Sequence, residues 1–403
     1  MIKLAAAVGV AGAALCATRA TRRPTVVALG VTAASLPVLM RDAARSRDPQ
    51  RLMLLLALQQ LRVVGAVAHE HLTRRLYSRR DADAYFREGL RLARAFRRGR
   101  LELRRAERPG ITGMRYFTAV VLLATGRSRT AAAIAFAWLA FCGLYCFYRA
   151  FCIAVPDGDA RLYLALLAFT PTLVFFPSSI SKQAWLLFSL GLASLGAALV
   201  LERQNAAGFL LVAAGLVCAF VVRPHIAAMF ALAFAAAVVV RVRDERVLGA
   251  VAAGAVVLAV LAVRYLRSWG IERGGVGSLF RQAGSQSNWG GSAFTPAAPA
   301  RLREIPAAIA TVLFRPHPLE AQSARVRLAA LESSLFFAFS IVRARSLVRA
   351  GRQAREHPYL VLAYSFTALF GIGYAWAANF GLLAQHRTQV LPFAFVPLAV
   401  RPS

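Results

Sequence analysis

The amino-acid sequence predicts an all-α protein, a polytopic transmembrane helical bundle of about 12 spans with one long outer-face loop. Of its 403 residues, 58% are hydrophobic, whereas soluble domains contain roughly 45–50% apolar residues. Apolar runs at residues 130–150, 183–201 and 247–266 are each close to the ~20 residues that a helix needs to cross a bilayer. Because a chain in lipid must satisfy its backbone hydrogen bonds internally, these runs are expected to be helices.

Twelve apolar segments are expected to be spans, separated by polar or basic connections. The first two form an N-terminal hairpin, and the last three follow a long loop. In chain order, the expected spans lie near residues 4–17, 24–40, 111–126, 130–150, 161–177, 183–201, 206–222, 225–240, 247–266, 330–342, 358–378 and 388–400.

These spans divide the chain into five parts. They are an N-terminal membrane hairpin (1–40), an Arg-rich cytoplasmic or interfacial segment (41–110), a transmembrane core (111–266), the outer-face loop (267–329) and a C-terminal transmembrane segment (330–403). Residues 52–68 are apolar but contain Gln59, Gln60 and Arg62, so we expect an interfacial helix there and not a span.

The distribution of arginine predicts which loops are cytoplasmic. The formal net charge is +31, and the arginines are densest at residues 41–108 and 343–355. Basic residues in short loops of membrane proteins collect on the cytoplasmic side, which explains the charge without a nucleic-acid partner. Strict alternation then places residues 267–329 and 379–387 on the outer face. It also places the basic loop at residues 18–23 there, which does not fit the rule.

Neither the cysteines nor the aspartates of the core predict a metal site. The five cysteines lie in or beside apolar runs without the paired spacing of a zinc site, and we interpret them as small hydrophobic residues. Asp157 and Asp159 fall on the cytoplasmic side, where they indicate a simple turn. One miscounted span would move them outside and make them candidates for a metal site or a general base.

The turn at residues 177–182 joins two expected spans and carries Lys182, one of only two lysines in the chain. Backbone N–H groups at a helix start, with serine hydroxyls and an ammonium beside them, can bind an anionic oxygen such as a phosphate. A structural alternative exists, because serines commonly cap helices and a lysine can extend its amine to the membrane surface. Lys182 is therefore a candidate substrate-binding residue.

An Arg-Pro-His triplet occurs twice, at residues 223–225 between two apolar runs and at residues 315–317 in the long loop. Ionisable residues at the depth of Arg223 are expensive and often functional, although an arginine can also extend to the surface. Chance recurrence is an alternative in a chain so rich in arginine. Arg223 and Arg315 are candidate substrate-binding residues.

The connection at residues 379–392 gathers Asn379, Gln385, His386 and Arg387 between two expected spans. A guanidinium can bind two phosphate oxygens at once, and a histidine can move a proton near neutral pH. We predict that Asn379, Gln385 and Arg387 bind substrate and that His386 is catalytic. A packing role is the alternative.

Acidic residues are scarce on the outer face. Under the predicted topology they are Glu272, Glu304, Glu320 and Glu332. A general base on that face must be one of these glutamates or a histidine. We take Glu320 and Glu332, together with His386, as the candidate catalytic residues.

Three segments together resemble a group of bacterial envelope proteins. They are Pro-Ser-Ser-Ile-Ser-Lys at 177–182, Phe-Arg-Pro-His-Pro-Leu-Glu at 314–320 with Leu-Glu at 331–332, and Asn-Phe-Gly at 379–381 through Arg387 to Pro392. The group is that of O-antigen and exopolysaccharide polymerases and multi-spanning C-superfamily glycosyltransferases. The motifs are short, and Phe176 and Gln183 stand where similar proteins often have a tryptophan and an acid.

The resemblance implies a membrane glycosyltransferase or polysaccharide polymerase of the bacterial cytoplasmic membrane. It would use a polyprenyl-phosphate-linked sugar donor at the outer face, and its partners would be membrane lipid, lipid-linked saccharide and envelope-biosynthesis proteins. A carrier or flippase for such lipids is one alternative, and a non-catalytic subunit of an envelope assembly complex is another. The residues do not decide the cofactor, and a divalent cation is compatible with this chemistry.

Overall fold

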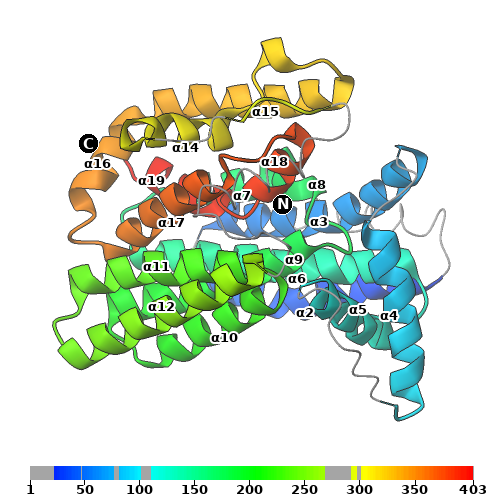
Figure 1. The fold of residues 1–403 in the computed structure, drawn as a ribbon. Coiled ribbons are helices and arrows are strands. Elements are labelled where there is room, and N and C mark those ends of the chain that lie inside the picture. The colour runs from blue at the N-terminus through cyan, green and yellow to red at the C-terminus, as the bar shows by residue number, and fades with distance from the viewer. Residues whose placement is uncertain are drawn as a thin grey trace. The chain divides into compact units, whose positions relative to one another are not determined.

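The computed structural model describes residues 22–46, 48–76, 81–100, 110–267, 292–296 and 301–402. This part of the chain contains no strand, and the structure is 83% helical, which confirms the all-α prediction (Figure 1). A single antiparallel bridge pairs Ala293 with Asn379. The expected span at residues 4–17 lies outside the described residues.

Six of the described helices are long and apolar enough to cross a membrane, which indicates a multi-pass membrane protein. Their spanning stretches are Arg22–Ser46 in α2, Pro49–Thr73 in α3, Arg129–Ala154 in α6, Lys182–Arg203 in α9, Pro224–Arg241 in α11 and Glu245–Tyr265 in α12. The other expected spans that fall within the described residues correspond to shorter or less apolar helices. The helix at the last expected span, α19 (Leu391–Leu398), has 8 residues, fewer than the ~20 that cross a bilayer. The count of about 12 spans therefore stays a prediction.

The chain forms two compact units. Unit 1 comprises residues 1–148 and 161–191, and unit 2 comprises residues 149–160 and 192–403. Unit 1 contains α2 (Arg22–Ser46), α3 (Pro49–Leu76), α4 (Asp81–Arg97), α5 (Ile111–Thr125), most of α6 (Arg129–Ala154), α7 (Ala160–Phe169), α8 (Pro171–Phe175) and the first half of α9 (Lys182–Arg203). Unit 2 contains α10 (Ala207–Val222), α11 (Pro224–Arg241), α12 (Glu245–Arg267), η1 (Leu302–Glu304), α14 (Ile305–Phe314), η2 (Pro318–Glu320), α15 (Ala324–Val342), α16 (Ala344–Gln353), α17 (Pro358–Tyr374), α18 (Phe380–Arg387) and α19 (Leu391–Leu398).

Helix α3 differs from the interfacial helix expected at residues 52–68, because it has the length and hydropathy of a span. Gln59, Gln60 and Arg62 are buried inside unit 1 and do not face water. The amide of Gln59 donates to the carbonyl of Val31 at 3.1 Å, and that of Gln60 lies 3.3 Å from the hydroxyl of Thr32. Polar side chains that are satisfied by a neighbouring helix do not exclude a span.

The expected span at 161–177 is broken into α7 and α8 by Pro171, the first residue of α8. In a continuous helix, residue 171 would donate its N–H to the carbonyl of Leu167, four residues earlier, but proline has no N–H. Arg62 of α3 donates its Nη2 to that carbonyl instead, at 2.9 Å. Arg62 is completely buried, so its guanidinium acts as a cap for the broken helix.

Glycines allow two helices of unit 1 to approach each other to backbone contact. A Cβ atom at Gly143 of α6 would overlap the carbonyl of Leu187, and one at Gly191 of α9 would overlap the carbonyl of Gly143. Small residues at such crossings are common in membrane helices, where close packing replaces the hydrophobic effect as the driving force.

Candidate functional site

Arg223 is the centre of a polar cluster in unit 2. It lies between α10 and α11, where Pro224 begins α11. Its Nη1 donates to the hydroxyl of Tyr374, the last residue of α17, at 3.1 Å. The same atom lies 2.5 Å from Nδ1 of His386 in α18. Two of the predicted site residues, Arg223 and His386, are therefore in direct contact.

His225 extends this cluster on the other side of Tyr374. Its Nε2 lies 3.1 Å from the Tyr374 hydroxyl, and its ring stacks with that of Tyr265 of α12 at 6.5 Å. Because the hydroxyl oxygen accepts from Arg223, its own hydrogen can be donated to Nε2 of His225 when that nitrogen carries no proton. The three side chains then form one directed chain from Arg223 through Tyr374 to His225.

The contact with Arg223 constrains the protonation of His386. A guanidinium only donates, so Nδ1 of His386 must be the acceptor and the ring proton resides on Nε2. A second proton on Nδ1 would break this hydrogen bond and place two cations side by side. His386 thus orients Arg223 through Nδ1, and its catalytic role stays a prediction.

Arg223 retains hydrogen-bond donors for a ligand. Within the described part of the chain, Nη1 is its only guanidinium nitrogen with a hydrogen-bond partner. Both partners are neutral groups, so no carboxylate there compensates its charge. Arg223 is half-buried between helices, where an uncompensated cation attracts an anion strongly because water screens it little.

Arg387 has a different environment, although it follows His386 directly. It is 1% exposed, and its Nη1 donates to the carbonyls of Leu313 and Arg315 at 2.7 and 3.1 Å and to the hydroxyl of Ser333 at 2.9 Å. The two carbonyls lie at the C-terminal end of α14, where backbone acceptors have no helical partner and a cation is favourable. These contacts give Arg387 a structural role as a helix cap.

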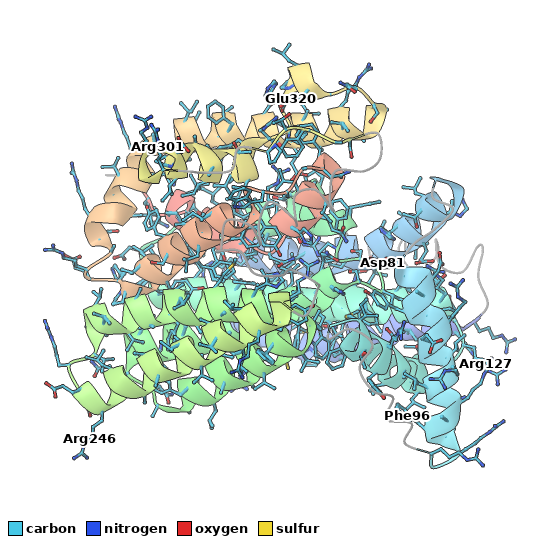
Figure 2. The ribbon with its side chains drawn as sticks, in the orientation of Figure 1. Asp81, Phe96, Arg127, Arg246, Arg301 and Glu320 are labelled. Atoms are coloured by element: carbon cyan, nitrogen blue, oxygen red, sulfur yellow. The ribbon has the colours of Figure 1, made fainter. Side chains whose placement is uncertain are left out.

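Arg315 and Glu320 form an ion pair with each other. The Glu320 carboxylate also accepts the backbone N–H of His317 at 3.0 Å, and the Arg315 guanidinium lies over the ring of Phe294 at 4.4 Å. Figure 2 labels Glu320 beside α15, and the pair orders the turn that contains η2. A carboxylate held in this way is poorly placed to remove a proton from a substrate.

The remaining predicted residues of unit 2 have separate environments, and the carboxylate of Glu332 interacts electrostatically with Arg387. Asn379 caps α18, because its Oδ1 accepts the N–H of Leu382 and the hydroxyl of Ser292, both at 3.0 Å. Gln385 and Glu332 are half-buried on α18 and α15. Asp159 lies in a turn and donates its N–H to the carbonyl of Ala399 at 2.7 Å.

Lys182 belongs to unit 1 and is the first residue of α9. The serines before it act structurally, since the hydroxyls of Ser179 and Ser181 both donate to the carbonyl of Phe176, at 3.0 and 3.1 Å. The convergence of Lys182 with the arginines of unit 2 stays a prediction.

Sequence reasoning missed Tyr374, which joins Arg223 to His225, because a tyrosine at the end of an apolar run is also typical of the membrane interface.

No group of three or more His, Cys, Asp and Glu side chains within the described ranges could hold a metal ion, and the use of a divalent cation stays untested. Comparisons with protein-family models, curated proteins and solved structures found no match for this chain.

Proposed function

We propose that this chain is a membrane glycosyltransferase or polysaccharide polymerase that uses a polyprenyl-phosphate-linked sugar donor at the outer face of a bacterial cytoplasmic membrane. One observation carries the proposal: Arg223, Tyr374 and two histidines form a hydrogen-bonded cluster at the break between α10 and α11. An uncompensated guanidinium beside a potential proton acceptor is what the transfer of a sugar from a phosphate requires.

The phosphate of the donor binds to the free N–H groups of Arg223. A guanidinium can hold two phosphate oxygens in parallel hydrogen bonds, and His386 keeps the guanidinium in place through Nη1. Such preorganised donors stabilise the negative charge that develops on a leaving group more than they stabilise the intact donor.

In the transfer step, the bond between the anomeric carbon and the phosphate oxygen breaks, and that oxygen keeps the electron pair beside Arg223. The acceptor hydroxyl oxygen forms the new bond to the anomeric carbon. Its proton passes to Tyr374 while the proton of Tyr374 passes to Nε2 of His225, so the proton ends on His225. The products are the extended glycan and the polyprenyl phosphate or pyrophosphate.

A carrier for the same lipids would need Arg223 but no proton acceptor. The broken helix α7–α8 supports this second candidate, since carriers often contain interrupted helices. His225 separates the two functions: a carrier keeps its activity in His225→Gln, whereas an enzyme loses the transfer step and still binds the donor.

The experiment compares lipid-linked saccharides in cells that lack the chain and in cells that carry wild type, Arg223→Ala, His225→Gln or Arg349→Ala at matched membrane levels. We expect the unextended lipid-linked intermediate to accumulate in Arg223→Ala and His225→Gln cells, at least tenfold over wild type. Arg349 of α16 has no hydrogen bond or ion pair within the described ranges, so Arg349→Ala is the matched control. Normal saccharide profiles in all three variants would reject the proposal.

A further inference from the structure

A second basic site belongs to unit 1, whereas the cluster around Arg223 belongs to unit 2. A pocket of about 590 Å³ is lined by four arginines: Arg22 and Arg23 at the start of α2, Arg97 at the end of α4 and Arg127 just beyond the end of α5. Figure 2 shows Arg127 projecting outward from unit 1.

The four arginines are electrostatically uncompensated. None of them makes a hydrogen bond or ion pair to another described residue, and no Asp or Glu is among the described residues that line the pocket. Like charges gathered in one pocket repel each other. A bound polyanion would offset this repulsion through its attraction to each of the four arginines. The charge pattern therefore selects a ligand with more than one negative charge.

The other wall of the pocket is apolar and open. It consists of Val26, Val27, Leu123 and Ala124, and Val26 and Leu123 are 65% and 39% exposed. Exposed apolar side chains next to a cluster of arginines suit a ligand with an anionic head and hydrocarbon chains. A free phosphate would leave this wall unused.

The position of the pocket along the helices also suits a lipid. Arg22 is the first residue of a candidate membrane span, and the ends of spans lie at the level of the lipid headgroups. Gly126, with a φ of 74°, ends α5 and allows the Arg23 guanidinium to lie against the helix terminus: a Cβ there would be 2.6 Å from Nη1 of Arg23.

We infer that this pocket binds the headgroup of an anionic phospholipid, with the phosphates on the four arginines and the acyl chains along Val26 and Leu123. Basic pockets between membrane helices recognise such headgroups on the cytoplasmic side. The pocket also brings Arg22 and Arg23 to the same side of the membrane as Arg97. The outer assignment of residues 18–23 and the cytoplasmic assignment of residues 41–108 cannot both hold.

The test uses the purified full-length chain in neutral detergent, with bound lipid measured by native mass spectrometry. Cardiolipin, which has two phosphates, is the probe, and phosphatidylcholine and sodium pyrophosphate are the comparison ligands. We expect Arg22→Gln/Arg23→Gln and Arg97→Gln/Arg127→Gln each to weaken cardiolipin binding about thirtyfold, since each arginine near an anionic headgroup contributes about fivefold. The control Arg349→Gln/Arg352→Gln, which removes the same charge from α16, should change binding less than about threefold.

Equal losses in all three double variants would show non-specific charge attraction and overturn the inference. The wild-type chain gives a test that does not depend on how the variants fold. If pyrophosphate displaces cardiolipin at equal concentration, the ligand is a free phosphate and the lipid assignment is wrong. Equal binding of cardiolipin and phosphatidylcholine would also overturn it.

Discussion

Arg62 in unit 1 and Arg387 in unit 2 are both completely buried, and each donates to helix carbonyls that the backbone leaves without a partner. Arg62 reaches one carbonyl, at the break that Pro171 makes between α7 and α8. Arg387 reaches two carbonyls at the end of α14 and the hydroxyl of Ser333. An arginine therefore caps a helix end in both units, through one acceptor in unit 1 and three in unit 2.

The number of acceptors, together with the nearby charge of Glu332 in the case of Arg387, decides whether such an arginine stabilises the fold. A guanidinium placed in a membrane interior costs about 2.5–3.5 kcal/mol on insertion scales, and a hydrogen bond to a charged group contributes about 1.5–3 kcal/mol. The Nη1 of Arg387 has two hydrogens, which its three acceptors share. Two such bonds outweigh the cost of burial, whereas a single bond about balances it. We therefore expect Arg387 to be essential for stability and Arg62 to be nearly neutral.

The largest effect is expected for Arg387→Met, which keeps the volume and removes the donor. It leaves the Leu313 carbonyl without a partner, so the free energy of unfolding should fall by about 2–4 kcal/mol. Denaturant unfolding in detergent measures this loss, with Arg352→Met on the exposed face of α16 as the control, expected within about 0.5 kcal/mol of wild type. A stable Arg387→Met chain with impaired saccharide transfer would instead assign Arg387 to substrate.

A smaller effect is expected at the ion pair that holds Arg315, one of the residues that Arg387 caps. Burial alone raises the pKa of Glu320, but the hydrogen bonds from Arg315 and the N–H of His317 outweigh it and hold the pKa below its ordinary value near 4.5. Glu320→Gln should therefore lower the free energy of unfolding by about 1–2 kcal/mol at neutral pH.

The pH dependence of this loss follows from the lowered pKa. The stabilisation by Glu320 is fully present above the ordinary carboxyl pKa, and it disappears as the pH falls through the lowered value. Wild type and Glu320→Gln should thus converge in stability at acidic pH. Glu245→Gln, at the exposed start of α12, serves as the control, and a constant difference between Glu320→Gln and wild type from pH 7 to pH 3 would contradict the ion-pair explanation.

Arg62→Met tests the other side of the comparison. The substitution removes one hydrogen bond and leaves the Leu167 carbonyl unsatisfied, but it also removes a buried charge with no carboxylate partner within the described ranges. These terms nearly cancel, so the free energy of unfolding should stay within about 1 kcal/mol of wild type. A loss as large as that of Arg387→Met would show that the number of acceptors does not determine how much a buried arginine stabilises the fold.

The smallest effect is a coupling between Arg62 and Pro171. Pro171→Ala supplies the N–H that Leu167 lacks and frees Thr170 from the extended conformation that a following proline favours. In this background Arg62→Met should cost about 0.5 kcal/mol less than in wild type. A double-mutant cycle measures the coupling, and strictly additive effects would show that Arg62 does not replace the missing donor.

The sequence predicted the helices better than the positions of the polar side chains. Hydropathy alone gives the apolar segments, because a helix in lipid needs only length and composition. The sequence predicted an interfacial helix at residues 52–68 because they include Gln59, Gln60 and Arg62. The partners of these side chains on α2 and α7 come from tertiary packing, which the sequence does not show. The break at Pro171 was readable in principle, since a proline inside an apolar run removes one hydrogen bond.

The candidate site was predicted in part. Arg223 and His386 were both chosen, and they are in contact. Arg387 was chosen as a phosphate ligand and Glu320 as a general base, yet the first caps α14 and the second pairs with Arg315. A sequence shows which side chains carry charge but not which carbonyls a broken helix leaves open, so it cannot separate a capping arginine from one that binds a ligand.

The cap on α7 also has a consequence for the order of events during synthesis. Arg62 precedes its acceptor by 105 residues, which at ~5–20 residues per second means roughly 5–21 s between the two. During that interval the guanidinium has no acceptor in the bilayer, so α3 is expected to stay at the membrane surface with its arginine in water. Entry of α3 into the bilayer then waits for the break at Pro171 to emerge from the ribosome, and an interfacial helix becomes a span only when its partner has been made.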